Sequence, residues 1–271
     1  MKKILVVFIS ILILMPEVKS STTSASSYIL MDQNTGRVLL SKDKDSQRLI
    51  ASITKIMTCI LALESGKSED VVIVDDNATS AYGSGIYIEV GEEIKLKDLL
   101  YGLMLRSGND AASMIAAYVS GSIEEFVKLM NNKAKELGMK NTIFYTPSGL
   151  PTPHGNLSSV YDMAILTKYA MQNKEYREIV STKKYKTATN KKAYIWHNKN
   201  KLLKYDYITG GKTGYTEESG RTLVSTANID NMNLIVVTIR DSDDWNTHLE
   251  LYNYAKDNYI SYKVLNKSKF K

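Results

Sequence analysis

The chain has 271 residues, of which 44% are apolar and 24% charged, with 15 Gly and 4 Pro. This composition is ordinary for a folded globular protein and excludes collagen-like, low-complexity and disordered chains. The net charge of +6 is modest, and no basic cluster is interleaved with aromatic residues, so nucleic acid is not expected as a partner. Cys59 is the single cysteine, which excludes an intramolecular disulfide and a cysteine-rich zinc site.

The N-terminus has the pattern of a secretory signal peptide. Two lysines precede an apolar run, residues 4–15, which Pro16 ends. The run is shorter than the roughly 20 apolar residues that a membrane span needs. We therefore expect residues 1–20 to direct export and residues 21–271 to be the mature protein. The alternative is an N-terminal anchor that is never cleaved.

The elements of the first two thirds of the chain follow a polar lead-in at residues 21–27. Two apolar runs that flank Gly36 predict a β-hairpin. Apolar periodicity then predicts a block of helices, and two of them begin with a serine three residues before an acidic residue, as in a capping box. These helices are expected to begin near Ser52, Leu96, Ser122 and Ser159.

After about residue 185 the sequence becomes rich in β-forming residues. Short strands are expected around residues 207–208, 221–227 and 234–239, followed by a last helix at residues 245–257. Strands therefore come from both ends of the chain. The sequence predicts a mixed α/β fold, with an antiparallel sheet from both chain ends flanked by helices and a helical lobe inserted at about residues 75–175.

Three short polar motifs carry the candidate chemistry. Ser-x-x-Lys alone is a weak signal, because it recurs at Ser41, Ser181 and Ser268. Only the copy at Ser52 begins a strongly apolar helix, where a spacing of three places the lysine one turn from the serine. The order of the three motifs in an exported chain makes the joint signal specific. The motifs are Ser52-Ile53-Thr54-Lys55, Ser107-Gly108-Asn109 and Lys212-Thr213-Gly214.

The first motif suits nucleophilic catalysis by Ser52. A serine hydroxyl is a poor nucleophile until a neighbouring base takes its proton. Lys55 can be that base if burial and a second cation, Lys212, lower its pKa. Free N–H groups at the start of the helix suit a developing oxyanion.

The other two motifs suit recognition of a peptide. The Ser107 hydroxyl can relay a proton towards a leaving amine, and the Asn109 amide can hold a substrate amide. Lys212 and Thr213 together offer a charge and a hydroxyl donor to a substrate carboxylate. Gly214 is expected to leave room for a peptide along the edge of the strand.

From Tyr28 to about His248 the sequence resembles the low-molecular-mass D-alanyl-D-alanine carboxypeptidases, which are serine penicillin-binding proteins of the bacterial cell wall. The likeness extends beyond the three motifs. One difference is Tyr215, which follows Lys-Thr-Gly where relatives often have His. The further segments that carry the likeness are residues 83–85, 90–92, 98–100, 146–150, 219–221 and 244–246.

The resemblance implies the fold shared by β-lactamases and DD-peptidases, with residues 21–271 as one catalytic domain. It implies removal of the terminal D-Ala from peptidoglycan stem pentapeptides through an acyl-enzyme, on the cell-wall side of the membrane. Backbone N–H groups of Ser52 and Tyr215 would form the oxyanion hole, and β-lactam antibiotics would inhibit. It implies no metal and no organic cofactor. The residues it assigns are the nucleophile Ser52, the base Lys55, the proton relay Ser107 and the substrate-binding residues Asn109, Lys212, Thr213, Gly214 and Tyr215.

The sequence features disfavour several alternative functions. A Ser-His-Asp hydrolase and a metallopeptidase are disfavoured, because none of the three histidines lies in the required spacing. A class A-like β-lactamase needs a Glu on the loop before the Lys-Thr-Gly strand, and residues 146–158 contain neither Glu nor Asp. A weakly active penicillin-binding wall sensor is separated only by a turnover assay. Cys59 is expected to be a buried, inert thiol, and the lysine-rich C-terminus lacks the apolar face of an anchor, so no stable membrane span is expected in the mature chain.

Overall fold

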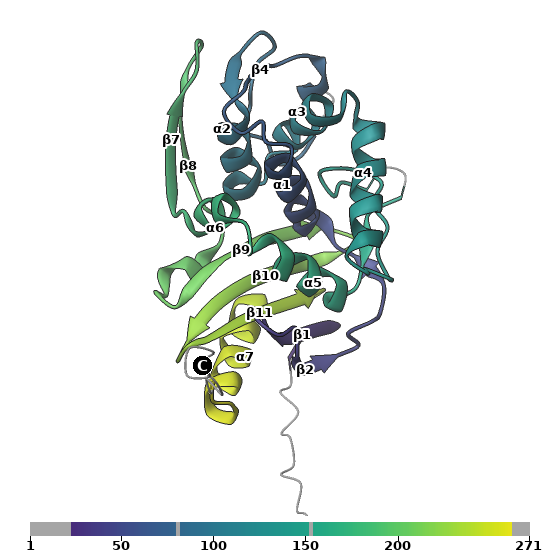
Figure 1. Ribbon diagram of the computed structural model, residues 1–271, viewed down its shortest axis with the longest axis vertical. Helices are drawn as coiled ribbons and strands as arrows, with labels where there is room; N and C mark the ends of the chain where they lie inside the picture. The colour runs from purple at the N-terminus through teal and green to yellow at the C-terminus, as the bar shows by residue number, and fades with distance from the viewer. Residues whose placement is uncertain (1–22, 80–81, 152–153, 262–271) are drawn as a thin grey trace, which may run out of the picture.

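The computed structural model describes residues 23–79, 82–151 and 154–261. The expected signal peptide lies outside the described residues, so this segment and the boundary of the mature domain stay predictions. The centre of the described structure is a five-stranded antiparallel sheet with the spatial order β2-β1-β11-β10-β9 (Figure 1). Its strands are β1 (Ser27–Asp32), β2 (Val38–Lys42), β9 (Ile208–Thr216), β10 (Gly220–Ile229) and β11 (Met232–Ile239).

The two ends of the chain meet inside this sheet. Strand β1 pairs with β11 in antiparallel register, from Ser27 opposite Ile239 to Asp32 opposite Leu234. The β1–β2 hairpin turns at Gly36, whose φ of +80° is one that glycine adopts readily. The antiparallel sheet built from both chain ends, predicted from the sequence, is therefore confirmed.

Both faces of the sheet are covered by helices. Successive strand residues face opposite sides, so Val224 and Val237 lie on the face that α5 covers, whereas Leu223 and Val236 pack against α7. Figure 1 shows β9 as the sheet edge nearest to the helical region, with β2 at the other edge. The covering helices are α5 (Val160–Ala170), α6 (Lys174–Ser181), which packs against β9, and α7 (Asp244–Asn258), whereas α1 (Lys55–Glu64) packs mainly against other helices.

The helical region surrounds α1, which is buried along nearly its whole length. The predicted caps are present: the Ser122 hydroxyl accepts from the Glu125 N–H, and the Ser159 hydroxyl accepts from the Asp162 N–H, both at 3.1 Å. Although α5 falls within the residues assigned to the helical lobe, it packs against the sheet. The remaining helices are α2 (Leu96–Tyr101), which continues as a π-helical turn (Gly102–Arg106), α3 (Asn109–Ser120) and α4 (Ile123–Glu136).

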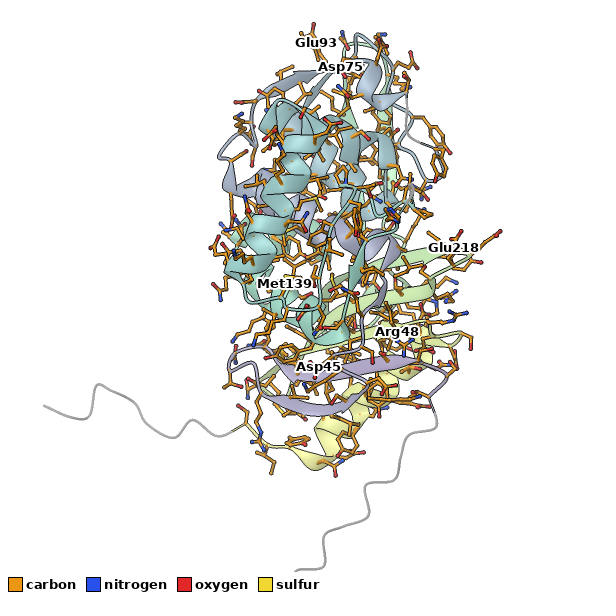
Figure 2. The ribbon with its side chains drawn as sticks, turned by 90° about the vertical axis from the view of Figure 1, so that its right-hand side faces the viewer. Asp45, Arg48, Asp75, Glu93, Met139 and Glu218 are labelled. Carbon is orange, nitrogen blue, oxygen red and sulfur yellow. The ribbon has the colours of Figure 1, made fainter. Side chains whose placement is uncertain are left out.

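Three two-stranded ribbons complete the described structure, and the sequence analysis did not predict them. The β7–β8 hairpin stands beside the helical region in Figure 1. Figure 2 shows Asp75 and Glu93 at the end of the molecule far from the sheet, and Glu218 projecting from the turn between β9 and β10. Within the described residues, no helix is both long and apolar enough to cross a membrane. The ribbons pair β3 (Arg48–Leu49) with β6 (Leu157–Ser158), β4 (Val71–Ile73) with β5 (Glu93–Lys95), and β7 (Lys184–Ala188) with β8 (Ala193–His197).

Candidate active site

Ser52 lies in a tight turn directly before helix α1. The sequence predicted that Ser52 begins the helix, whereas residues Ala51–Thr54 form a 3-10 turn and Lys55 is the first residue of α1. Side chains three residues apart eclipse one another in a 3-10 turn. The Ser52 Oγ and the Lys55 Nζ accordingly lie 3.0 Å apart.

The Lys55 amine is fully buried and has three polar neighbours. Besides the Ser52 hydroxyl, its Nζ lies 2.8 Å from the Asn109 Oδ1 and 2.6 Å from the backbone oxygen of Ser148. These two carbonyl oxygens can only accept hydrogen bonds. A neutral amine therefore donates both of its N–H groups to them, and its lone pair is left for the Ser52 O–H.

The surroundings of Lys55 favour this neutral form. Burial lowers its pKa well below the ordinary lysine value, and the charges of Lys212 and Lys199 lower it further, whereas Asp110 opposes them. Burial disfavours an ammonium because the protein interior replaces its hydration shell poorly. The site thus meets the condition that the sequence analysis set for a lysine base.

Asn109 begins helix α3 and is held at every polar group. Its Oδ1 accepts from Lys55, its Nδ2 donates to the Tyr82 carbonyl at 2.6 Å, and its backbone N–H donates to the Ser84 carbonyl at 2.7 Å. The substrate contact expected of Asn109 stays a prediction. In the structure its side chain orients Lys55.

The Lys-Thr-Gly motif lies within strand β9. Lys212 is buried, and its Nζ donates to the Ser107 hydroxyl at 3.1 Å and to the Thr213 carbonyl at 2.7 Å. Burial, with help from the charge of Lys199, lowers the pKa of Lys212 to about 7. Ser107 itself has a left-handed backbone, with φ of +66°. The hydrogen bond from Lys212 to Ser107 therefore joins the Lys-Thr-Gly motif to the Ser-Gly-Asn motif.

Gly214 is where β9 touches the nucleophile turn. A Cβ at this position would lie 2.9 Å from the Ser52 nitrogen, 3.1 Å from the Ile53 nitrogen and 2.4 Å from the Thr222 Oγ1. The sequence predicted that this glycine leaves room for a peptide, but the space beside it is filled by the Ser52 backbone. The glycine is needed because β9 and the turn are in backbone contact.

A cavity of about 470 Å³ opens over these residues. Lys55, Asn109 and Lys212 do not line it, because they are buried behind its wall. Strand β9 forms one side of the cavity and is an edge strand of the main sheet, so an extended peptide can pair with it. The predicted site residues on the cavity wall are Ser52, Ser107, Thr213, Gly214 and Tyr215.

Five residues of the cavity wall were not assigned to the site from the sequence: Ser84, Lys199, Arg221, Asp244 and Trp245. All except Lys199 lie in segments that carry the family likeness. The sequence therefore pointed to these segments but predicted no function for the individual residues. Lys199 gave no signal in a lysine-rich stretch, although its Nζ donates to the Ser84 hydroxyl at 3.1 Å. A second cavity, of about 530 Å³ beside β5 and β7, contains none of the predicted residues.

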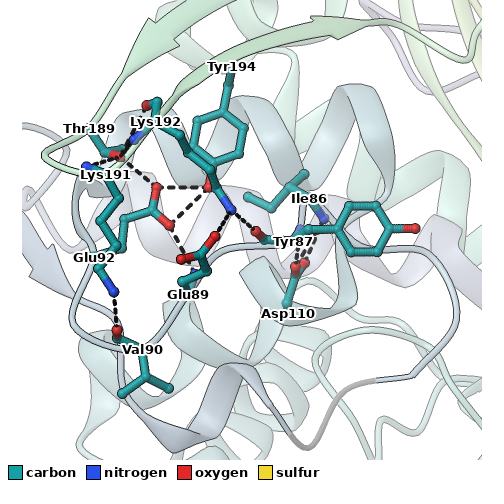
Figure 3. A network of polar contacts seen from close by, with 10 residues as sticks. All are labelled: Ile86, Tyr87, Glu89, Val90, Glu92, Asp110, Thr189, Lys191, Lys192 and Tyr194. Atoms are coloured by element: carbon teal, nitrogen blue, oxygen red, sulfur yellow. Dashed lines mark hydrogen bonds and ion pairs between the residues drawn. The ribbon is translucent and has the colours of Figure 1, made fainter.

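The loop that carries Tyr82 and Ser84 is anchored by Asp110. The Asp110 carboxylate accepts from the Ile86 N–H at 3.0 Å and from the Tyr87 N–H at 2.7 Å (Figure 3). These bonds hold Tyr87 at φ of +61°, an uncommon conformation for a bulky residue. Asp110 therefore keeps the loop against the start of α3, where Asn109 binds it.

The β7–β8 hairpin anchors the same loop from the other side. The buried Glu92 carboxylate accepts from the Tyr194 hydroxyl at 2.8 Å and from the Thr189 hydroxyl at 2.6 Å, and Lys192 donates to Glu89 at 2.6 Å and to the Tyr87 carbonyl at 2.7 Å (Figure 3). A hairpin distant from Ser52 thereby fixes the loop that orients Asn109.

The remaining candidate groups lie outside the site. His154 and His197 are exposed, and His248 is buried beneath the sheet beside Ser225, where burial lowers its pKa to about 3. The expected burial of Cys59 is confirmed, and burial raises the pKa of its thiol. Within the described ranges, no group of three or more His, Cys, Asp or Glu side chains is placed to hold a metal ion.

The fold and the geometry around Ser52 define the class of the serine DD-peptidases and penicillin-binding proteins. Residues 15–243 match the profile of the family described as D-alanyl-D-alanine carboxypeptidase, and the chain belongs to this family. A D-alanyl-D-alanine carboxypeptidase of Bacillus subtilis is 43% identical over 220 residues, which are 79% of this chain and 56% of the relative. One from Escherichia coli is 31% identical over 265 residues, which are 90% of this chain and 66% of the relative.

Solved structures show the same fold. A D-alanyl-D-alanine carboxypeptidase from Mycobacterium tuberculosis superposes with a TM-score of 0.84 at 27% identity, covering 88% of this chain and 92% of that one. A DD-transpeptidase from Streptomyces has a TM-score of 0.82 at 28% identity, covering 87% and 98% of the two chains. The predicted DD-peptidase-like fold is confirmed. The chain spans 56% and 66% of the length of the two curated relatives named above.

Proposed function

We propose that this protein is a serine-type D-Ala-D-Ala carboxypeptidase that removes the terminal D-Ala from peptidoglycan stem pentapeptides. The observation that carries the proposal is the 3.0 Å approach of the Ser52 Oγ to the amine of a fully buried Lys55. The two remaining partners of that amine are acceptors only, which leaves its lone pair for the serine proton. Membership of the family supports the same activity.

In the acylation step, Lys55 takes the proton of Ser52 as the Oγ attacks the carbonyl carbon of the penultimate D-Ala. The backbone N–H groups of Ser52 and Tyr215 stabilise the oxyanion, and each such donor is worth about 10²–10³ in rate. The proton then passes through the Ser107 hydroxyl to the leaving nitrogen. The C–N bond breaks, D-Ala departs, and an ester remains on Ser52.

In the deacylation step, water attacks this ester, and Lys55 takes a proton from the water. The tetrahedral intermediate collapses, and the proton returns to the Ser52 oxygen. The shortened peptide leaves with a new carboxylate. No metal or organic cofactor takes part in the proposed sequence.

Substrate binding is assigned to β9 and the residues beside it. The peptide lies along the edge strand, the Thr213 hydroxyl donates to the terminal carboxylate, and Lys212 lies behind Thr213 with its Nζ on the Ser107 hydroxyl. Action on peptidoglycan requires export, and the signal-peptide pattern of residues 1–20 supports a location on the cell-wall side of the membrane.

Release of D-Ala from a synthetic stem pentapeptide by the purified protein tests the activity, with Ser52→Ala as the control. Brief exposure to penicillin tests the nucleophile, because the tethered leaving group of a β-lactam blocks the approach of water. Intact-mass spectrometry should show one added penicillin, and peptide mapping should place it on Ser52. D-Ala release by the Ser52→Ala variant would contradict the proposal.

The same experiment separates the alternatives. Rapid hydrolysis of penicillin without a lasting adduct indicates a β-lactamase, although residues 146–158 carry no carboxylate that could activate water. An adduct on Ser52 without D-Ala release from the peptide indicates a penicillin-binding sensor.

A further inference from the structure

Arg221 places a charged group at the cavity from the sheet, next to Thr213. Arg221 of β10 is directly opposite Tyr215 of β9, and Thr213 is opposite Leu223, so Arg221 and Thr213 are diagonal neighbours on one face. Diagonal neighbours lie about 7–8 Å apart, within reach of a long side chain. Arg221, Thr213 and Tyr215 all line the cavity that contains Ser52.

The guanidinium of Arg221 is held in place, but only some of its nitrogens have a hydrogen-bond partner. Its Nη2 donates to the Asp244 Oδ1 at 2.6 Å, and its Cζ lies 5.5 Å from the centre of the Trp245 ring. Asp244 is 3% exposed and begins α7, so it is a fixed partner, whereas the Arg221 side chain is 40% exposed. Among the described residues, neither the Nη1 nor the buried Nε of Arg221 has a hydrogen-bond partner.

Lys212 is less suited than Arg221 to meet a substrate charge directly. Lys212 is 1% exposed, does not line the cavity, and directs its Nζ to Ser107 and the Thr213 carbonyl. With its pKa lowered to about 7, it is also only partly charged near neutral pH. An arginine keeps its charge at every working pH and matches a carboxylate with a planar fork of donors.

We propose that Arg221 binds the terminal carboxylate of the peptide together with the Thr213 hydroxyl, and that Asp244 positions the Arg221 guanidinium. This inference rests on the proposed function, because it names the residue that makes the site select a free C-terminus. Lys199 lines the cavity as well, but its Nζ donates to the Ser84 hydroxyl of the loop that is anchored on α3.

The test compares two peptides that differ only at the C-terminus, one ending in D-Ala-D-Ala acid and one in its amide. In the wild type, amidation should lower kcat/KM roughly ten- to a hundredfold, as for the loss of a charge-assisted hydrogen bond. Arg221→Gln should lose a similar factor on the acid and almost nothing more on the amide. Arg240→Gln removes the same charge from an exposed residue outside the cavity and should behave as the wild type.

Two further variants separate recognition from folding. Arg221→Gln leaves the buried Asp244 without its cation, so the Arg221→Gln/Asp244→Asn double variant removes both charges and should show the same loss of selectivity. Asp244→Asn alone should raise the KM for the acid peptide with little change in kcat, as expected of a positioning residue. An unchanged KM would overturn the role of Asp244.

A second readout does not depend on turnover. The rate of Ser52 acylation by penicillin, divided by the rate for its methyl ester, should fall towards one in both Arg221 variants. If the Arg221 variants keep the wild-type preference for the acid, or if Lys199→Met loses it instead, the proposal is overturned. If the wild type releases no D-Ala from either peptide, the proposed function fails, and the acylation ratio still decides whether Arg221 recognises a carboxylate.

Discussion

Gly214→Ala is a direct test of the contact between the edge strand and the nucleophile turn. The added Cβ would lie 2.9 Å from the Ser52 nitrogen and 3.1 Å from the Ile53 nitrogen, and both atoms belong to the backbone. Ordinary contacts of a Cβ begin at 3.4 Å, so β9 and the turn must separate by about half an ångström. The Thr222 hydroxyl, 2.4 Å away, must also move.

The expected cost has two parts. Over-packing of this kind lowers the free energy of unfolding by about 1–3 kcal/mol. The shift also moves the Ser52 N–H, a proposed oxyanion donor, and the Ser52 Oγ relative to Lys55. Because a misplacement of about 1 Å costs roughly a hundredfold in rate, we expect acylation by penicillin to slow by about ten- to a hundredfold.

The acylation rate of purified variants and their urea unfolding curves measure the two parts separately. The matched control is Thr222→Ala, which removes the nearest side-chain contact and one hydrogen bond to the Ile50 carbonyl. The Gly214→Ala/Thr222→Ala double variant retains both backbone contacts, so its acylation should stay slow. Recovery of the wild-type rate in the double variant would refute the reasoning, because a flexible side chain alone would then explain the defect.

Three further predictions follow from buried groups. Lys55→Arg keeps a cation that cannot release its proton, so acylation should fall by about 10²–10⁴-fold with the circular dichroism spectrum retained, and near-normal turnover would remove Lys55 from the mechanism. The folded pKa of Lys212, about 7, lies below its ordinary value of 10.5. Below pH 7 Lys212 is protonated in both the folded and the unfolded state, so burial of its charge lowers the free energy of unfolding by the full amount. Between pH 7 and 10.5 the unfolded state binds more protons at Lys212, so this residue adds to the free energy of unfolding, as pH rises, at most about 1.4 kcal/mol per unit. Lys55, whose pKa is also lowered, adds its own rise, so the slope should be smaller in Lys212→Met but not zero. If the free energy of unfolding of Lys212→Met rises with pH as steeply as that of the wild type, this prediction is wrong. Cys59 should resist thiol reagents until the protein unfolds, and modification of the native protein would show that α1 opens.

The sequence by itself determined the parts of this protein that depend on local pattern. Capping serines and apolar periodicity predicted helices α4 and α5, because the cap and the residues it serves are three positions apart. The pairing of Ser52 with Lys55 was predicted for the same reason, since a spacing of three brings the two side chains together. The order of the three motifs indicated the family without any knowledge of their contacts.

Only the tertiary structure decided how the site is assembled. The Ser148 carbonyl that holds Lys55 is a backbone atom, and no residue type in the sequence signals its role. The β7–β8 hairpin was missed because the partners of its inward side chains lie about a hundred residues earlier in the chain, where no local pattern connects the two segments.

Arg221 and Gly214 also show the difference between what local sequence predicts and what the tertiary structure decides. Both residues stand in recognised segments, but the role of each depends on a neighbour from another element: Asp244 of α7 for the guanidinium, and the Ser52 backbone for the glycine. Local pattern follows from interactions within a few residues, whereas a binding site is made where distant strands, helices and loops pack together. The physical reason is that long-range contacts depend on the three-dimensional path of the backbone, which no short stretch of sequence encodes.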